Sequence, residues 1–209
     1  MARVKDLDRL HPAMKAKVEA MMDDLSSSPH NWRVYETWRK PATKKSTSST
    51  SQTDPNKNPS RHGYGAAVDV VPNGTWGPKG TPWRKASWPG WAELRKAAHK
   101  AGLDNDISWD RPHVEVKRTQ ITKWLQQAIG VKDDGKYGPA TDTAAKVFAQ
   151  SHGIEWLHPV PTASPKVHPT TYNEIMNASD KTWQGAGIAG GSVALVAAIA
   201  AWWIWRGKS

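Results

Sequence analysis

Histidine and aspartate side chains stand at spacings that suit metal chemistry in the run from Ser60 to Asp69. His62 lies in a glycine-rich turn, and Asp69 lies on a predicted strand over residues 66–71. Because side chains alternate along a strand, the small residue Ala67 shares one strand face with Asp69 and leaves space beside it. If a second histidine joins His62 and Asp69, the three side chains would form a zinc site with one position left for water.

A second run, over residues 109–115, offers that histidine. Pro112 disfavours a helical conformation for the residue before it, so this run is not the helical H-E-x-x-H motif of other zinc proteases. We expect His113 to begin a strand, with Glu115 on the same face as a hydrogen-bonding partner for a metal ligand. Asp110 would lie beside the metal without binding it, where a carboxylate can accept a proton from water and return it to a leaving amine.

A purely structural interpretation is the alternative for these residues. In that case His62 would cap its turn, and Asp69 and Asp110 would form salt bridges. The other histidines have no carboxylate partner at a recognisable spacing, and we expect them on the surface or in ordinary packing: His11, His30, His99, His152, His158 and His168.

The two runs together resemble a known family of zinc peptidases. S-x-H-x-x-G-x-A-x-D beginning at Ser60, followed by D-x-P-H-x-E beginning at Asp110, is similar to D-alanyl-D-alanine carboxypeptidases, vancomycin-resistance dipeptidases and the L-alanyl-D-glutamate endopeptidases of phage endolysins. The resemblance covers roughly residues 7–117. It implies that the cofactor is Zn²⁺ and that Asp110 is the general base. We expect Ser60 and Glu115 to lie beside the ligands and support them without binding the metal. The implied zinc ligands are His62, Asp69 and His113.

The same family has an arginine in an upstream stretch of the form V-x-E-x-x-R. Residues 34–39 fit this form, so the resemblance implies that Arg39 binds a substrate carboxylate or the tetrahedral oxyanion. A salt bridge at the end of a strand is the alternative role for Arg39. The family often has a glutamine a few residues further on, whereas Lys44 and Lys45 occupy that area here.

Residues 1–117 contain the elements that would position these side chains. The pattern predicts an α+β fold, in which a small antiparallel sheet and flanking helices surround a zinc cleft. Between the elements lie a Ser/Thr-rich loop over residues 43–53 and an irregular loop over residues 72–91 that is rich in Trp, Pro and Gly. The expected elements are a helix with buried positions from Leu10 to Leu25, a strand over 32–38, the strand over 66–71, a helix over 91–101 and a strand over 113–116.

Residues 118–180 are expected to form a separate three-helix module. A helical stripe runs from Ile121 to Ile129, and Pro139 occupies the first position of a second helix. A third, short helix is expected near residues 172–176. Residues 119–155 are similar to the three-helix peptidoglycan-binding domain of cell-wall hydrolases, which implies peptidoglycan as a partner.

The segment from Thr182 to Trp205 has 24 residues without a formal charge, which is long enough to cross a bilayer as a helix. Trp202, Trp203 and Trp205 stand where an interfacial aromatic belt would lie. We therefore expect a membrane helix over residues 182–205, with a buried helix of the globular part as the alternative. The N-terminus has no apolar run after its basic residues, so no secretory signal peptide is expected.

Composition limits the functions that remain. The 29 Lys and Arg residues outnumber the 19 Asp and Glu residues, and the net charge of +10 suits an anionic polymer or surface. The absence of cysteine excludes a thiolate metal site, a thiol nucleophile and a disulfide scaffold. Nucleic acid is not an expected partner, because the basic residues are scattered and form no known recognition motif.

The expected function is that of a phage-type endolysin. Such an enzyme would be a zinc metallopeptidase that hydrolyses peptidoglycan stem peptides, at the L-Ala–D-Glu bond by analogy with phage enzymes, and so lyses the cell wall. It would act on the periplasmic wall while associated with the membrane of the bacterial host. The alternatives are a D-Ala-D-Ala carboxypeptidase and a non-catalytic, membrane-tethered wall-binding protein.

Overall fold

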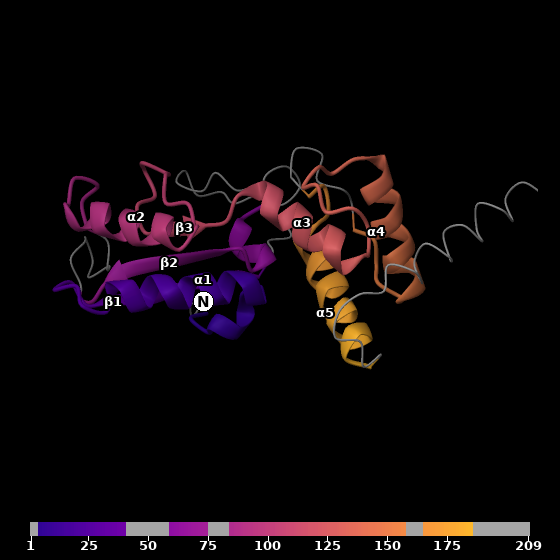
Figure 1. The fold of residues 1–209 in the computed structure, drawn as a ribbon, viewed down its shortest axis with the longest axis horizontal. Helices are drawn as coiled ribbons and strands as arrows, with labels where there is room; N and C mark the ends of the chain where they lie inside the picture. The colour runs from indigo at the N-terminus through magenta and orange to yellow at the C-terminus, as the bar shows by residue number, and fades with distance from the viewer. Residues whose placement is uncertain (1–3, 41–58, 75–83, 158–164, 186–209) are drawn as a thin grey trace, which may run out of the picture. The chain divides into compact units, whose positions relative to one another are not determined.

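The computed structural model describes residues 4–40, 59–74, 84–157 and 165–185 (Figure 1). The expected α+β class is confirmed, since the described residues contain one three-stranded antiparallel sheet and five α-helices. The chain divides into two compact units, and the division falls between Lys117 and Arg118.

Helix α1 (Pro12–Leu25) begins the core of the first unit. His11 caps its N-terminus, because the Nδ1 atom of His11 accepts a hydrogen bond of 3.2 Å from the backbone N–H of Ala13. The apolar positions recur at helical spacing, and the helix packs against α2 (Gly90–Lys100) and strand β1 (Trp32–Glu36). The buried positions of α1 are Met14, Val18, Met21 and Leu25.

The sheet has the order β1-β2-β3, and both strand pairs are antiparallel. Strand β2 (Ala67–Pro72) lies in the middle, and all six of its residues are buried. Strand β3 (His113–Glu115) is short, and β1 ends two residues earlier than the predicted strand over 32–38. In the register of the sheet, Asp69 lies opposite Glu36 on one side and opposite His113 on the other.

A short 3₁₀-helix, η2 (Arg61–Tyr64), carries the first motif, and Gly65 ends it in the left-handed conformation with φ of +64°. A Cβ atom added at Gly65 would lie 2.9 Å from the carbonyl oxygen of Arg9, in the 3₁₀-helix η1 (Leu7–Arg9), and 3.0 Å from the backbone nitrogen of His11. The carbonyl oxygen of Gly65 also accepts a hydrogen bond of 3.0 Å from that nitrogen. Only glycine therefore lets the η2 turn lie this close to the start of α1.

The second unit contains helices α3 (Arg118–Ala128), α4 (Pro139–Ser151) and α5 (Pro169–Gly185), and α5 packs against both α3 and α4. Helix α5 is longer than the short helix expected near residues 172–176. The buried side chain of Gln126 holds the turn before α4, since its amide bonds Asp134, the carbonyl oxygen of Lys136 and the Thr141 hydroxyl.

The expected membrane segment overlaps the end of α5 at residues 182–185, and residues 186–209 lie outside the described part of the chain. Among the described residues, no helix combines the length and apolar character needed to cross a bilayer.

Candidate metal centre

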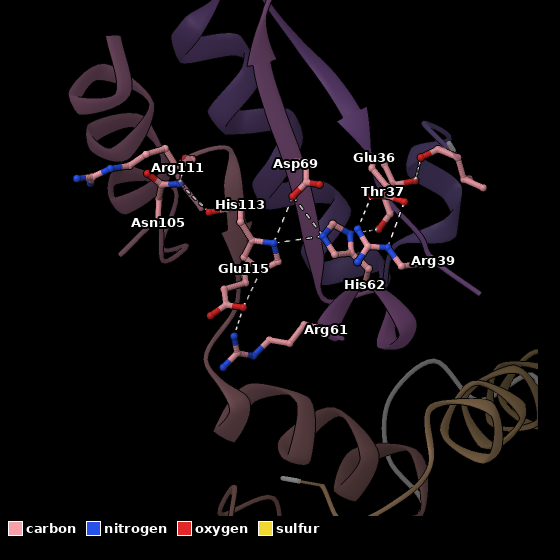
Figure 2. Close-up of polar contacts among 11 residues, drawn as sticks. Glu36, Thr37, Arg39, Arg61, His62, Asp69, Asn105, Arg111, His113 and Glu115 are labelled. Carbon is pink, nitrogen blue, oxygen red and sulfur yellow. Dashed lines mark hydrogen bonds and ion pairs between the residues drawn. The ribbon is translucent and has the colours of Figure 1, made fainter. Parts of the chain in front are cut away.

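Three side chains from three elements meet in the first unit (Figure 2). The Nε2 atom of His62, from η2, lies 3.3 Å from the Oδ1 atom of Asp69, on β2. The Nδ1 atom of His113, on β3, also lies 3.3 Å from that oxygen, and the two histidine nitrogens are 3.2 Å apart. All three residues are buried. Residues expected to bind a metal are thus brought together, although His62 and His113 are 51 positions apart in the chain.

Each histidine is held by its other ring nitrogen. The Nδ1 atom of His62 lies 3.1 Å from the carbonyl oxygen of Thr37, which can only accept a hydrogen bond. The Nε2 atom of His113 lies 2.8 Å from Oε2 of Glu115. Both partners favour a proton on the nitrogen that faces them, which leaves the nitrogen that faces Asp69 able to bind a cation.

The spacing of these atoms fits a tetrahedral metal ion. Two ligand atoms each about 2.05 Å from zinc, at a tetrahedral angle, lie about 3.3 Å apart. The three measured separations, from 3.2 to 3.3 Å, match the edges of one face of such a tetrahedron. The buried group of His62, Asp69 and His113 can therefore hold a metal ion.

The charges in the site depend strongly on one another. Burial alone would raise the pKa of Asp69, but hydrogen bonds with His113 and His62 hold that pKa well below its ordinary value. Burial alone would lower the pKa of His113, but its bonds with Asp69 and Glu115 raise it to about 9. At neutral pH the metal-free His113 therefore carries a second proton, on the ring nitrogen that faces Asp69. A bound cation would have to displace this proton.

Asp110 lies in the turn that leads into β3, three residues before the ligand His113. Its partial burial raises the pKa of its carboxyl group. The charges of His113 and His62 lower this pKa, and the charge of Asp69 raises it. The backbone holds the turn, since the N–H of His113 donates a 3.1 Å hydrogen bond to the carbonyl oxygen of Asp110. A carboxylate beside a metal site can accept a proton from water, and a bound cation would lower the pKa of that carboxyl group again.

The expected substrate arginine has a partner inside the protein. Arg39 forms two hydrogen bonds with the buried carboxylate of Glu36, of 3.3 Å from Nε and 2.5 Å from Nη2. The charges of Asp69 and Asp110 also act on Arg39, which places its guanidinium near the metal group. The structure thus shows the salt bridge that was the alternative role for Arg39. It also leaves Arg39 close enough to the metal group for the charge of Asp69 to act on it.

Glu115 and Ser60, which were expected beside the ligands, differ in what they contact. Glu115 bonds His113 and forms an ion pair with Arg61. The carbonyl oxygen of Ser60 accepts a 2.9 Å hydrogen bond from the N–H of Gly63, but the Ser60 side chain does not cap η2. Ser60 therefore contributes to the backbone of the turn that carries His62.

Sequence reasoning missed several residues that position the site. Asn105 is buried, and its side-chain amide donates to the carbonyl oxygens of Arg111 and His113, over 2.8 and 2.6 Å, so it fixes the turn around Asp110 (Figure 2). Thr37 acts through its carbonyl oxygen, which any residue type supplies. Arg61 pairs with Glu115, which lies far along the chain, so no local pattern in the sequence could have identified this ion pair.

The comparisons with known proteins identify no family for this chain. No protein-family model matches the chain, and neither the curated proteins nor the solved structures contain a significant match. Lys44 and Lys45, at which the sequence departs from the zinc peptidase pattern, lie outside the described residues.

Proposed function

We propose that this chain is a zinc-dependent peptidase that hydrolyses the stem peptides of bacterial peptidoglycan, as phage endolysins do. The observation that carries the proposal is the buried triangle of His62, Asp69 and His113. It is supported by Asp110, because the charges of all three ligands act on its carboxyl group. Three protein ligands leave one coordination position open, which is typical of catalytic rather than structural zinc sites. Asp110 supports an enzyme over a structural metal site, because a structural site needs no base.

The residues divide the chemistry among them. A zinc ion supplies Lewis acidity, which lowers the pKa of water and polarises a carbonyl group. Asp110 accepts the proton of the attacking water and passes it to the nitrogen of the leaving amine. Arg39, oriented by Glu36, stabilises negative charge on the substrate, either a carboxylate or the oxyanion that forms as the peptide bond breaks.

The substrate assignment rests on the sequence resemblance. We propose cleavage of the L-Ala–D-Glu bond, because phage enzymes with a similar D-x-P-H ending cut there. A D-Ala-D-Ala carboxypeptidase uses the same zinc chemistry and is the second candidate. The net charge of +10 supports either choice, since stem peptides present carboxylates to the enzyme.

The rest of the chain would bring the enzyme to its substrate. The module of α3, α4 and α5 is proposed to bind peptidoglycan, because its sequence over residues 119–155 is similar to wall-binding domains. Residues 182–205 are proposed to associate with the membrane of the bacterial host, because they form 24 consecutive residues without a formal charge. The enzyme would then act on the periplasmic wall from the membrane surface.

Digestion of purified peptidoglycan tests this function. Wild-type protein, Asp110→Asn and Asp106→Asn are incubated with and without a zinc chelator, and the products are read by mass spectrometry. We expect Asp110→Asn to lower the cleavage rate by about 10²- to 10⁴-fold, the usual contribution of a general base. Asp106→Asn is the matched control, because Asp106 is an exposed aspartate four positions earlier that pairs with Arg95.

The products also decide between the candidates. A new amino terminus at D-Glu supports the endopeptidase, and one at D-Ala supports the carboxypeptidase. Cleavage that survives chelation, or that is equal in Asp110→Asn and wild type, contradicts the zinc peptidase. If the wild-type protein instead binds the wall without cleaving it, the result supports a non-catalytic wall-binding protein.

A further inference from the structure

The two metal histidines are supported by chemically different partners. His62 faces a neutral group, the backbone carbonyl oxygen of Thr37. His113 faces an anion, the carboxylate of Glu115, at 2.8 Å. A carboxylate that accepts a hydrogen bond from an imidazole makes the opposite ring nitrogen a stronger metal ligand, and it fixes the orientation of the ring. The metal affinity of the site should therefore depend more on the support of His113 than on that of His62.

Glu115 is itself held by a cation. The Nη1 atom of Arg61 forms an ion pair with the same oxygen, Oε2, that bonds His113. The two side chains are largely enclosed, with 22% of Arg61 and 11% of Glu115 exposed. Removal of one partner would leave the other charge in partly buried surroundings without compensation, so the two act as a unit.

The position of Arg61 in the chain gives this pair its significance. Arg61 immediately precedes the ligand His62 on η2, whereas Glu115 follows the ligand His113 by two residues on β3 (Figure 2). The ion pair therefore joins the two segments that carry the histidine ligands, outside the ring of ligand atoms. It restrains the separation of the segments and the rotation of the His113 imidazole at the same time.

We propose that Arg61 and Glu115 form a clamp that sets how tightly the site holds its metal, with Arg61 as a positioning residue that acts on the metal only through Glu115 and His113. The inference rests on the metal site of the proposed function but not on the reaction or its substrate. The clamp orders His113 before the metal arrives, so less conformational freedom is lost on binding. It also slows release, because His113 cannot turn away while Glu115 is held.

Zinc affinity and zinc release of the full-length protein test the clamp. Affinity is measured by competition with a chromophoric chelator, and release by trapping zinc with excess chelator after loading. The variants are Arg61→Gln, Arg61→Lys, Glu115→Gln and the double variant Arg61→Gln/Glu115→Gln. Arg95→Gln is the matched control, because Arg95 forms a more exposed ion pair, with Asp106, in the same unit.

We expect Arg61→Gln and Glu115→Gln each to weaken zinc binding by about 10- to 100-fold, the usual effect of losing a residue that supports a metal ligand. The double variant should lose less than the product of the two single effects, because both remove the same clamp. Arg61→Lys should recover part of the affinity, since it keeps the cation. Arg95→Gln should bind zinc as the wild type does.

Thermal unfolding of the metal-free proteins separates a clamp from a general structural tie. The clamp is supported if the double variant, which leaves neither charge unpaired, binds zinc more weakly than wild type while its metal-free unfolding temperature stays close to that of Arg95→Gln. It is overturned if Arg61→Gln and Glu115→Gln bind zinc within about twofold of wild type, or if the losses multiply in the double variant. A wild-type protein that binds zinc but cleaves no peptidoglycan would overturn the proposed function and leave the clamp intact.

Discussion

Asp69 is the residue on which the candidate metal centre is built. It lies on the central strand, in register with His113, and its Oδ1 atom is 3.3 Å from each histidine. The two histidine nitrogens lie 3.2 Å from each other, so one carboxylate oxygen organises both imidazoles. The site therefore depends on correct strand register, because a slip of one residue would turn Asp69 to the other face of the sheet.

The proton on His113 predicts how zinc binding depends on pH. The pKa of His113 in the metal-free protein is raised to about 9, whereas a metal ligand must be neutral. Zinc binding at pH 7.5 should release about one proton, and affinity should rise with pH about tenfold per unit until about pH 9. Calorimetric titration in buffers of different ionisation enthalpy measures the protons released. An affinity that is constant from pH 7 to pH 8.5 would contradict this account.

Trp109, next to Asp110 in the chain, is a candidate contact for the proposed substrate. Its side chain is 61% exposed, which makes it the exposed large hydrophobic residue of the described chain. An exposed indole beside a catalytic group can pack on the apolar faces of a peptide or a sugar. We expect Trp109→Ala to raise KM for peptidoglycan by about tenfold with little change in kcat, and Trp109→Tyr to retain most of the affinity. Equal KM values in Trp109→Ala and wild type would remove Trp109 from the substrate site.

At the scale of elements, the positions of the ligands could be predicted from sequence because each motif is short and local. A glycine-rich turn before a strand placed His62 and Asp69, and Pro112 placed His113 at a strand start. The contacts that orient these side chains could not be predicted in the same way. Thr37 reaches His62 across 25 positions through a backbone carbonyl group, which leaves no mark on residue type.

For the secondary structure too, local patterns were predictable from sequence and features that depend on distant packing were not. The buried helix α1 and the strands β2 and β3 lie where the sequence patterns predicted them, within one or two residues at each end. Helix α5 extends well beyond the predicted residues 172–176. The prediction was too short because no continuous apolar stripe marks the rest of the helix, which packs against α3 and α4. The order of the strands follows from pairing between distant segments, which local patterns do not encode.

The turn that ends η2 provides a test at this scale. Gly65 and Gly153 have almost the same backbone angle, with φ of +64° and +65°, so an alanine carries the same local strain at both. An added Cβ meets nothing within 4 Å at Gly153, whereas at Gly65 it meets backbone atoms at 2.9 and 3.0 Å. Gly65→Ala should therefore lower the free energy of unfolding by about 1–3 kcal/mol more than Gly153→Ala, as measured by denaturant titration. Equal losses would show that the backbone around η2 can move aside.

At the scale of the whole molecule, the unit that holds the candidate metal centre is joined to segments that are proposed to keep it near its substrate. The buried metal group lies within the first unit, which ends at Lys117. The ligands, Asp110 and the residues that orient them all belong to that unit. Zinc binding and the chemical step should therefore be independent of the residues beyond Gly185, whereas location in the cell should depend on them.

Deletion of residues 186–209 separates these two properties. The deleted residues hold most of the uncharged stretch from Thr182 to Trp205, so the shortened protein should leave the membrane fraction and appear in the soluble fraction. Its zinc affinity and its rate on soluble muropeptides should stay within about twofold of wild type, since α5 ends at Gly185 and every metal ligand is retained. Fractionation of cells after expression, with immunoblotting of each fraction, measures the first effect. If both proteins fractionate alike, the segment is not a membrane anchor. If zinc affinity falls with the deletion, the metal centre depends on residues 186–209, which lie outside the first unit.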